Sequence, residues 1–375
     1  MSTIKKAHTP FRADIVGSFL RPAALKEARA KFEEGSISRE ELTKVEDELI
    51  IDLVAKQKAA GYHVITDGEF RRATWHLDFM WGFEGVEHKK TQQGVCFHEE
   101  QALIDDTYLV GKISTNNHPF VEHFKFVKAL EDENTVAKQT IPAPAQFLQQ
   151  MIIKANVETT RKFYPTNEEL IQDIAAGYRK VIQDLYDAGC RNIQFDDCTW
   201  GVCVSNDGCS RYDDNEDLNS IMEQLLYVNN LAIEGKPEDL VINTHVCRGN
   251  YHSTYFGSGS YDSVAEFLFQ RENVDAYYLE YDDERSGSFE PLQYVTGNKK
   301  VVLGLITTKS PILEEKETII QRIHEASKYI PLERLYLSPQ CGFASCEIGN
   351  KLTEEDQWAK LRLVREIAEE VWQDE

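Results

Sequence analysis

The stretch LVINTHVCRG, residues 240–249, carries the pattern that decides the fold. Three apolar residues, typical of a buried strand, are followed by His245 and Cys247. The same arrangement recurs at two later apolar runs, which lead to Glu280 and Cys341. Side chains at the ends of parallel strands meet at one rim of a barrel, where chemistry happens in such folds. The pattern therefore predicts an enzyme with its site at that rim.

Short apolar runs alternate with helical patterns over most of the 375 residues, which is typical of β-α units around a parallel sheet. We predict a (β/α)8 TIM barrel of the α/β class, and a doubly wound open sheet is the main alternative. No GxGxxG follows the first strand, which weighs against a dinucleotide-binding version of that alternative. The expected strands are Ile15 to Phe19, Val64 to Thr66, Ala137 to Ile141, Ile193 to Phe195, Val241 to Thr244, Tyr277 to Leu279, Val301 to Ile306, and Leu335 to Leu337.

Helical spacing of apolar residues predicts helices between these strands. In residues 167–188 apolar residues recur every three or four positions, and Gly189 lies just past the end. Thr353 and Asp356 form a Thr-x-x-Asp pattern compatible with a capping box. The acidic run at residues 281–284 is expected to be a solvated loop. The expected helices are Asn167 to Ala188, Glu40 to Ala60, Asn219 to Ile233, Glu314 to Tyr329, and Glu354 to Trp372.

Residues 74–134 break the alternation, and we interpret them as an insertion near the barrel mouth. The segment is rich in aromatic residues and contains an expected hairpin around Tyr108 to Ile113. Its aromatic side chains fit a small core, and they also suit the wall of a pocket for a planar ligand; they are Trp75, Phe79, Trp81 and Phe83. We expect residues 1–375 to form one catalytic domain that includes this insertion.

Charge and hydropathy exclude several classes of partner. The formal net charge is −22 and the isoelectric point is near 4.9, so nucleic acid and anionic membranes would be repelled. No apolar run approaches the roughly 18 to 20 residues of a membrane span, and the first residues lack the apolar stretch of a signal peptide. We expect a cytoplasmic protein that binds small molecules, and its oligomeric state stays open.

The eight cysteines, in a chain without an export signal, predict reduced thiols rather than a disulfide framework. Cys198, Cys203 and Cys209 cluster in the sequence, but no His or fourth Cys completes the spacing of a zinc knuckle. Cys346 is a spare candidate ligand, although Cys341 is closer to its strand. Most of these thiols are expected to pack as small apolar side chains.

His245 and Cys247 are two positions apart, so both side chains point to the same face of a regular strand. Zinc accepts imidazole, thiolate and carboxylate ligands together, which makes Zn2+ the expected metal. The spacing alone is weak evidence, and the strand-end placement of Glu280 and Cys341 strengthens it. Two thiolates suit a reaction on sulfur, because the ion lowers the pKa of an incoming thiol.

Three other strand ends carry candidate binding residues. Gly17 and Ser18 lie in VGSFLRP, where a tight turn and a ligand contact are both compatible with the sequence. Glu69 in TDGEFRR fits either a partner for an ammonium group or an acid at a helix N-terminus. Asp196 and Asp197 in IQFDDCTWG suit cation binding or proton transfer as a pair, or else one helix cap and one solvated charge.

In these motifs the chain resembles the catalytic half of cobalamin-independent methionine synthase, and more closely the short single-barrel proteins of that family. The resemblance runs from VGSF at residues 16–19 to the C-terminal helix. Its most specific element is the order of H-x-C, a strand-ending Glu and the P-x-C-G of residues 339–342. The resemblance implies a (β/α)8 barrel in which zinc is held by His245, Cys247, Glu280 and Cys341.

The resemblance also implies an activity. A methyl group would pass from a 5-methyltetrahydrofolate, or a similar methylfolate or other methyl donor, to the thiol of homocysteine, which gives methionine. Homocysteine would bind zinc through its sulfur, with Gly17 and Ser18 near its carboxylate and with Glu69 and Asp196 near its ammonium. Asp196 is also a candidate for proton transfer.

The chain departs from the family's pattern on the donor side. Full-length members carry a second, N-terminal barrel that contributes to binding the folate's glutamate tail, and this sequence has no such segment. The family's GPVT strand, followed by a Trp, reads IPAPAQFL here, with Phe147 or Leu148 near the Trp position. Lys309 stands where the family has a His that is a candidate proton donor, and a lysine can donate only if its pKa is lowered.

Three other functions stay open. Zinc-dependent alkyl transfer to or from another small thiol would leave Glu69 and Asp196 without an ammonium partner. A non-catalytic metal-binding or regulatory barrel would bind zinc without a zinc-dependent response to thiols. A barrel decarboxylase of the porphyrin-processing type would call for Arg rather than thiolates at the mouth.

Overall fold

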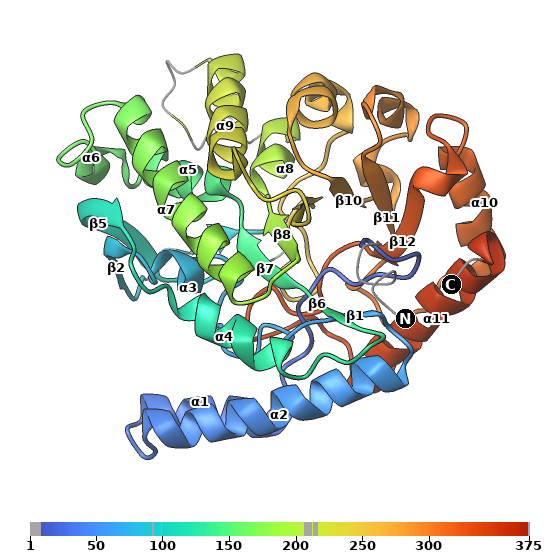
Figure 1. The fold of residues 1–375 in the computed structure, drawn as a ribbon, viewed down its shortest axis with the longest axis horizontal. Coiled ribbons are helices and arrows are strands. Elements are labelled where there is room, and N and C mark those ends of the chain that lie inside the picture. Colours follow the sequence, from blue (N-terminus) through green and yellow to red (C-terminus); the bar gives the residue numbers. More distant parts are fainter. Residues whose placement is uncertain (1–8, 92–93, 99, 206–211, 213–216, 374–375) are drawn as a thin grey trace.

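Parallel strands at the centre of the molecule form a barrel, and helices surround them (Figure 1). The computed structural model describes residues 9–91, 94–98, 100–205, 212 and 217–373. The barrel strands are β1 (Val64–Ile65), β6 (Val136–Ala137), β7 (Gln139–Pro142), β8 (Asn192–Asp196), β9 (Val241–Val246), β10 (Ala276–Glu280), β11 (Lys300–Ile306) and β12 (Leu335–Pro339). Six of them form one sheet in the order β12-β11-β10-β9-β8-β7. Only one residue separates β6 from β7, so the two continue the same barrel strand. β6 pairs in parallel with β1, which extends the series to β1.

The first barrel strand lies earlier in the chain than predicted. Ala13 forms a parallel bridge with Leu337 of β12, whereas the predicted strand that begins at Ile15 forms no ladder. Pairing stops because the Ile15 N–H donates to Asp14 Oδ1 at 2.8 Å and the Ile15 carbonyl accepts from Lys138 Nζ. Side chains thus take the backbone groups that a longer strand would need.

The barrel closes between this first segment and β1. Thr66, directly after β1, donates its hydroxyl to the Gly17 carbonyl at 2.7 Å, and the Phe19 N–H donates to the Gly68 carbonyl at 3.1 Å. The other seven predicted strands overlap β1, β6 with β7, and β8 to β12. The closed parallel series confirms the (β/α)8 barrel and excludes the doubly wound open sheet.

The five predicted helices are confirmed, each within a few residues of its expected ends. They are α2 (Arg39–Ala59), α7 (Asn167–Asp187), α9 (Leu218–Ile233), α10 (Lys316–Ala326) and α11 (Glu354–Trp372). The predicted capping box, in which Thr353 and Asp356 exchange hydrogen bonds, begins α11. Further helices are α1 (Ala23–Glu33), α3 (Leu77–Met80), α4 (Pro119–Lys128), α5 (Pro144–Ile152), α6 (Val157–Thr160) and α8 (Thr199–Val204). In the described part of the chain, no helix has the length and apolar character needed to cross a membrane.

Residues 74–134 hold short elements outside the strand series of the barrel. Besides α3 and α4 they are β2 (Glu84–Lys89), β3 (Val95–Cys96), β4 (Gln101–Ala102) and β5 (Asp106–Ser114). β2 and β5 pair antiparallel, and β5 packs against α7 (Figure 1). The hairpin expected at residues 108–113 is wrong. The stretch lies within one strand, in which Leu109 and Ile113 are buried and their neighbours are more exposed.

The aromatic side chains of this segment have different environments. Phe79 and Phe83 are buried and pack on Tyr178 of α7, with ring centroids 5.2 and 6.0 Å away. Trp81 is only partly buried and packs at the edge of the same core. Trp75 lines a cavity at the barrel mouth. The segment therefore contributes both to the core and to a pocket wall.

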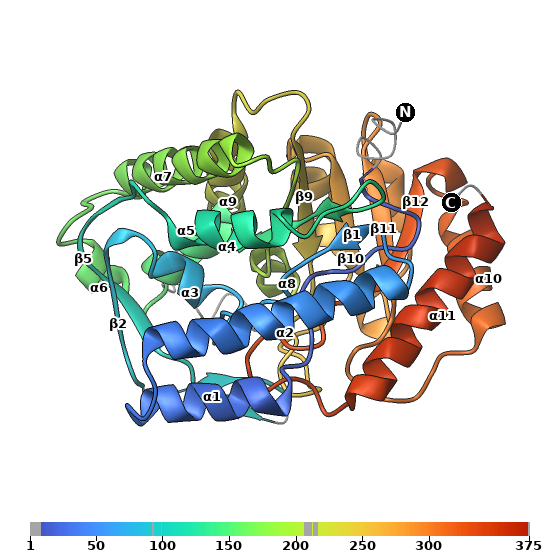
Figure 2. The same cartoon turned by 60° about the horizontal axis from the view of Figure 1, so that its bottom comes forward.

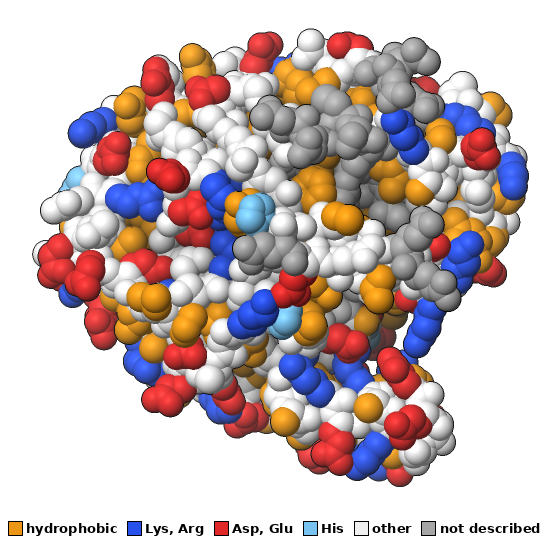
Figure 3. Space-filling model, turned by 180° about the vertical axis from the view of Figure 1, so that it is seen from behind, with side chains coloured by type: hydrophobic (Ala, Val, Ile, Leu, Met, Phe, Trp, Pro, Cys, Tyr) orange, Lys and Arg blue, Asp and Glu red, His pale blue; other side chains and the backbone are white. Residues whose placement is uncertain are grey.

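The long helices α1 and α2 lie side by side along one flank of the barrel (Figure 2). Acidic and basic side chains are interspersed on the face that Figure 3 shows, from which the α1–α2 hairpin projects at the lower edge. On that face the net charge of −22 is not gathered into one patch.

Candidate active site

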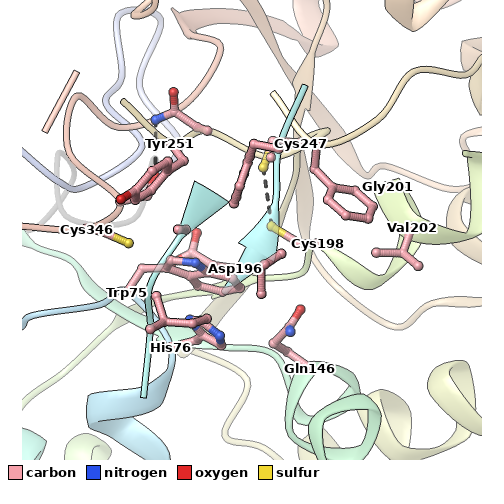
Figure 4. A pocket seen from close by; sticks show the side chains of 18 of the residues that line it. Trp75, His76, Gln146, Asp196, Cys198, Gly201, Val202, Cys247, Tyr251 and Cys346 are labelled. Atoms are coloured by element: carbon pink, nitrogen blue, oxygen red, sulfur yellow. Dashed lines mark hydrogen bonds between the residues drawn. The ribbon is translucent and has the colours of Figure 1, made fainter. Parts of the chain in front are cut away.

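One cavity of about 800 Å³ lies at the carboxyl ends of the barrel strands. Six residues predicted from strand ends line it: Ser18, Glu69, Asp196, His245, Cys247 and Cys341. Figure 4 shows Asp196 and Cys247, from neighbouring strands, beside the same space. The sequence also predicts Gly17, Glu280 and Lys309, which do not line the cavity.

His245, Cys247 and Cys341 form a compact group of buried metal-type donors. One donor atom from each lies within 4.8 Å of the other two. His245 Nδ1 lies 3.3 Å from the Tyr278 carbonyl oxygen, and a ring N–H that donates there leaves the lone pair on Nε2. Nε2 is buried and has no hydrogen-bond partner among the described residues. One imidazole nitrogen and two thiols at this spacing fit a zinc ion.

The thiols of this region are electrostatically unequal. Hydrogen bonds from Cys198 and Cys341 hold the pKa of Cys247 well below the usual thiol range, and His245 adds to the effect. The pKa values of Cys198 and Cys341 are raised, because each shares a hydrogen bond with Cys247 and because the surrounding protein desolvates their charged forms. These hydrogen bonds favour a negative charge on Cys247, and a thiol must lose its proton to bind a metal.

Glu280, the fourth predicted ligand, lies outside the three-residue group. Its Oε2 accepts from the Arg248 N–H at 2.8 Å, and its Oε1 accepts from Arg285 Nη2 at 3.1 Å. Lys309 Nζ lies 3.9 Å from the same Oε1. Burial raises the pKa of Glu280, and the charge of Lys309 partly opposes this. Both oxygens are thus held by protein donors, which a metal ion would have to replace.

Lys309 forms an ion pair behind the cavity wall. Its Nζ donates to Asp282 Oδ2 at 2.7 Å. Burial acts to lower the pKa of Lys309, but the charges of Glu280 and Asp282 outweigh it, so the pKa is raised. A lysine that donates protons at neutral pH needs the opposite shift. The expectation of a solvated loop at residues 281–284 is wrong at its start, because Tyr281 is fully buried and the Asp282 side chain is 1% exposed.

Glu69 holds an unpaired carboxylate oxygen at the cavity. Its Oε1 accepts from Thr140 Oγ1 at 2.9 Å and lies 3.4 Å from Arg72 Nη1. Its Oε2 is buried and has no hydrogen-bond partner among the described residues. The backbone φ of Glu69 is 61°, in the left-handed region that a residue with a side chain rarely adopts. A buried oxygen without a donor is costly, and a bound cation would relieve that cost.

Asp196 and Asp197 do not act as the predicted pair, because neighbouring residues at a strand end point to opposite sides. Asp196 lines the cavity, and its Oδ1 accepts from Gln194 Nε2 at 2.7 Å. Burial raises the pKa of Asp196 to about 7. Asp197 is fully buried away from the cavity, where its Oδ1 accepts from the Thr199 N–H at 3.0 Å. Only Asp196 is placed to meet a ligand.

The loop after β12 holds Ser18 at the rim. The Ser18 carbonyl accepts from the Phe343 N–H at 3.0 Å. A Cβ on Gly342 would lie 1.9 Å from Ser18 Oγ, so this approach requires glycine. Gly17 is also tightly packed, since a Cβ there would lie 2.6 Å from Thr140 Cγ2. Close packing against Thr140 is thus one reason for glycine at residue 17, and the contact of Gly17 with a ligand stays a prediction.

Cys198 is a cavity residue that motif spacing did not single out. Its Sγ lies 3.4 Å from Cys247 Sγ, and the contact is drawn in Figure 4. The sequence groups Cys198 with Cys203, which is buried in α8, and with Cys209, which lies outside the described residues. Cys346 lines the cavity but does not join the three-residue group. The position of Cys198 relative to its strand could have identified it. Cys198 lies two residues after Asp196 at the end of β8, just as Cys247 lies two residues after His245.

The aromatic wall of the cavity does not come from residues 147 and 148, the positions that correspond to the family's Trp. Phe147 and Leu148 are fully buried and do not line the cavity. Trp75 and His76 both line it, and their rings stack with centroids 4.3 Å apart (Figure 4). Phe97 and His98 of the insertion also line the cavity, so the insertion supplies several flat side chains to its wall.

These features define a (β/α)8-barrel protein with a thiol-rich metal-type site at the carboxyl ends of its strands. The chain belongs to the cobalamin-independent synthase family, since residues 11–370 match the sequence profile of that family's catalytic domain. The uncharacterized protein YxjG of Bacillus subtilis is 43% identical over 373 residues, which cover 99% of this chain and 97% of YxjG.

Solved structures show the same relationship. A protein of Listeria monocytogenes assigned as a vitamin-B12-independent methionine synthase superposes with a TM-score of 0.76 at 40% identity, over 97% of this chain and 98% of that one. A B12-independent methionine synthase of Shewanella, in complex with selenomethionine, superposes with a TM-score of 0.73 at 21% identity and the same coverage. The second likeness shows the shared fold.

Proposed function

We propose that this protein is a zinc-dependent methyltransferase that moves a methyl group from a 5-methyltetrahydrofolate, or a similar donor, to the thiol of homocysteine. One observation carries the proposal. The donor group of His245, Cys247 and Cys341 shares a cavity with the unpaired carboxylate oxygen of Glu69. The first suits a sulfur atom on a metal, and the second suits an ammonium group. A thiol amino acid presents both.

His245, Cys247 and Cys341 would hold the zinc, and Glu280 would join as a fourth ligand if its Oε1 left Arg285. The unpartnered His245 Nε2 supports a metal here, because a buried nitrogen without a partner is costly. When bound, zinc would take the homocysteine sulfur as a ligand and lower its pKa, which supplies a nucleophilic thiolate at neutral pH.

The protein's own carboxylates would orient the amino acid. Glu69 Oε2 and the Asp196 carboxylate would accept from the ammonium group, and Ser18 would lie near the substrate carboxylate. Holding the substrate at both ends fixes its sulfur for in-line transfer, which lowers the entropic part of the barrier. Asp196, with a pKa near 7, is our candidate for exchanging a proton with the substrate.

Two structural relatives support this proposal. The Listeria protein is assigned as a methionine synthase, and selenomethionine in the Shewanella complex is a close analogue of the expected product. The unpaired Glu69 oxygen favours homocysteine over a thiol that lacks an ammonium group. The methyl donor would occupy the part of the cavity beside Trp75, and we assign residues 1–375 to one catalytic domain.

The test is methionine formation. The zinc-loaded protein is incubated with homocysteine and with each of a panel of donors: mono- and polyglutamylated methyltetrahydrofolates and simpler methyl compounds. We expect methionine with at least one donor, and loss of zinc and of turnover in Cys247→Ser. The matched control is Cys190→Ser, a buried thiol outside the cavity lining. No methionine from any donor, or full turnover without zinc, would contradict the proposal.

A further inference from the structure

Two thiols of unequal exposure meet at the cavity. The Sγ atoms of Cys198 and Cys247 are 3.4 Å apart, and Figure 4 shows them facing each other. Cys247 belongs to the three-residue donor group, whereas Cys198 does not. Cys198 is partly exposed, Cys247 is buried, and both line the cavity. A small reagent in the cavity therefore reaches Cys198 first.

The two thiols follow the ends of neighbouring parallel strands. β8 and β9 are parallel neighbours, with Asp196 opposite His245, and Cys198 and Cys247 each lie two residues further along. The Asp197 N–H donates to the His245 carbonyl at 2.8 Å, which keeps the two chains together. Neighbouring strands are about 4.8 Å apart, so the two chains leave their strands at a separation close to the roughly 4.4 to 6.8 Å between Cα atoms that disulfides bridge. The sulfurs need only close from 3.4 Å to about 2 Å.

We propose that Cys198 and Cys247 are an oxidation site at which a small peroxide forms a reversible disulfide. The thiolate is the form that attacks a peroxide. The Cys198 sulfur, whose proton is shared with Cys247 Sγ through the 3.4 Å hydrogen bond, attacks one peroxide oxygen, so that an S–O bond forms and the O–O bond breaks. The thiol proton passes to the departing oxygen, which leaves as water or an alcohol. The Cys247 sulfur then attacks the Cys198 sulfenic acid, the S–S bond forms, and water leaves with the Cys247 proton. The peroxide is reduced by two electrons, and the two thiols are oxidised by two.

The disulfide removes one of the two thiols from the donor group of His245, Cys247 and Cys341. Oxidation therefore ejects a metal from the site, and a dithiol that reduces the bond restores it. Cys341 is a poorer first target, because it is buried. Cys346 is partly exposed, as Cys198 is, but Figure 4 shows it well apart from Cys247.

The experiment uses the zinc-loaded full-length protein, treated with hydrogen peroxide and digested for mass spectrometry, with zinc release followed by a coloured chelator. We expect a cross-linked peptide pair that contains Cys198 and Cys247, lighter by two hydrogens, and dithiothreitol should remove it. In Cys198→Ser the cross-link should be absent and zinc release at least tenfold slower. Cys346→Ser, another partly exposed cavity thiol, should behave as the unsubstituted protein does.

A cross-link between Cys247 and Cys341, no cross-link at all, or unchanged zinc release in Cys198→Ser would overturn the proposal. The disulfide depends on thiol geometry alone, and only its effect on metal rests on the proposed function. A protein that makes no methionine yet forms this cross-link would therefore refute the proposed function and leave the oxidation site standing.

Discussion

The unpaired oxygen of Glu69 is the residue-scale feature that most constrains the substrate. Replacing Glu69 by Gln keeps the shape and removes the charge that an ammonium group would meet. A hydrogen bond to a charged group contributes about 1.5 to 3 kcal/mol, so we expect the KM for homocysteine in Glu69→Gln to rise roughly 10- to 100-fold, with kcat changed much less. Steady-state kinetics of the zinc-loaded protein measure this split.

The matched control is Glu272→Gln, which alters a buried Glu that does not line the cavity. Its KM for homocysteine should stay within about twofold of the original value. An unchanged KM in Glu69→Gln would show that Glu69 does not bind the substrate ammonium.

Asp196 gives the site a pH dependence with a definite sign. Burial raises the pKa of this carboxyl to about 7, and the ammonium group is bound by the ionised form. The ionised fraction therefore rises between pH 6 and 8, and the KM for homocysteine should fall about tenfold over that range. The measurement is a KM profile against pH, and Asp196→Asn should lack this fall. If the KM for homocysteine depended on pH in the same way in Asp196→Asn and in the unsubstituted protein, Asp196 would not bind the ammonium group.

The loop after β12 supports the site by packing closely against Ser18, and Gly342 is the residue that makes this contact. Its φ is not positive, yet an added Cβ would lie 1.9 Å from Ser18 Oγ. We expect Gly342→Ala to lower the free energy of unfolding by about 1 to 3 kcal/mol and to raise the KM for homocysteine by displacing Ser18. Urea denaturation and steady-state kinetics check the two effects.

The control for this substitution is Gly111→Ala in β5, where the nearest atom to an added Cβ is 3.5 Å away, an ordinary contact. It should change the free energy of unfolding by no more than about 0.5 kcal/mol. Equal stability of Gly342→Ala and Gly111→Ala would mean that the loop moves aside freely.

Most of the barrel was predictable at the scale of elements, because buried parallel strands are continuous apolar runs and helices repeat every three to four residues. The first strand was misplaced because its end is set by Asp14 and Lys138, which occupy the backbone groups of Ile15. The spacing of apolar residues in the sequence does not reveal that side chains compete for these backbone groups. The hairpin expected at residues 108–113 failed for a different reason, since Gly111, a residue typical of turns, lies within β5, the strand paired with β2.

The site was predictable in part. Strand-end placement brought His245, Cys247 and Cys341 into one group, because parallel strands deliver their carboxyl ends to one rim. Three features depend on contacts across the fold and were not predictable from spacing. They are the hydrogen bond from Arg285 to Glu280, the burial of Asp197 away from the cavity, and the contact between the sulfur atoms of Cys198 and Cys247.

At the scale of the whole molecule, Glu272 links stability to pH. It is fully buried between barrel units, where its Oε1 accepts from Asn229 Nδ2 at 2.8 Å, and the same amide group donates to Asp197. Burial, and next the charge of Asp197, raise the pKa of Glu272 to about 8 from an ordinary value of 4.5. Between these values the folded chain binds one more proton than the unfolded chain.

The contribution of Glu272 to stability is therefore complete below about pH 4.5 and is lost as pH rises toward 8, by up to about 1.4 kcal/mol per pH unit. Glu272→Gln lacks this titration. The free energy of unfolding of the variant, minus that of the unsubstituted protein, should therefore increase as the pH rises. Urea unfolding at pH 5, 6.5 and 8 measures the difference. A difference that stays constant over this range would show that Glu272 does not titrate there.

We propose that a metal at His245, Cys247 and Cys341 takes the thiol of homocysteine as a ligand. Zinc X-ray absorption of the metal-loaded protein, recorded before and after homocysteine is added, tests it most directly. We expect two sulfur neighbours of zinc before addition and three after it, with zinc–sulfur distances of about 2.3 Å. A sulfur count that stays the same when homocysteine binds would show that the thiol does not ligate the metal.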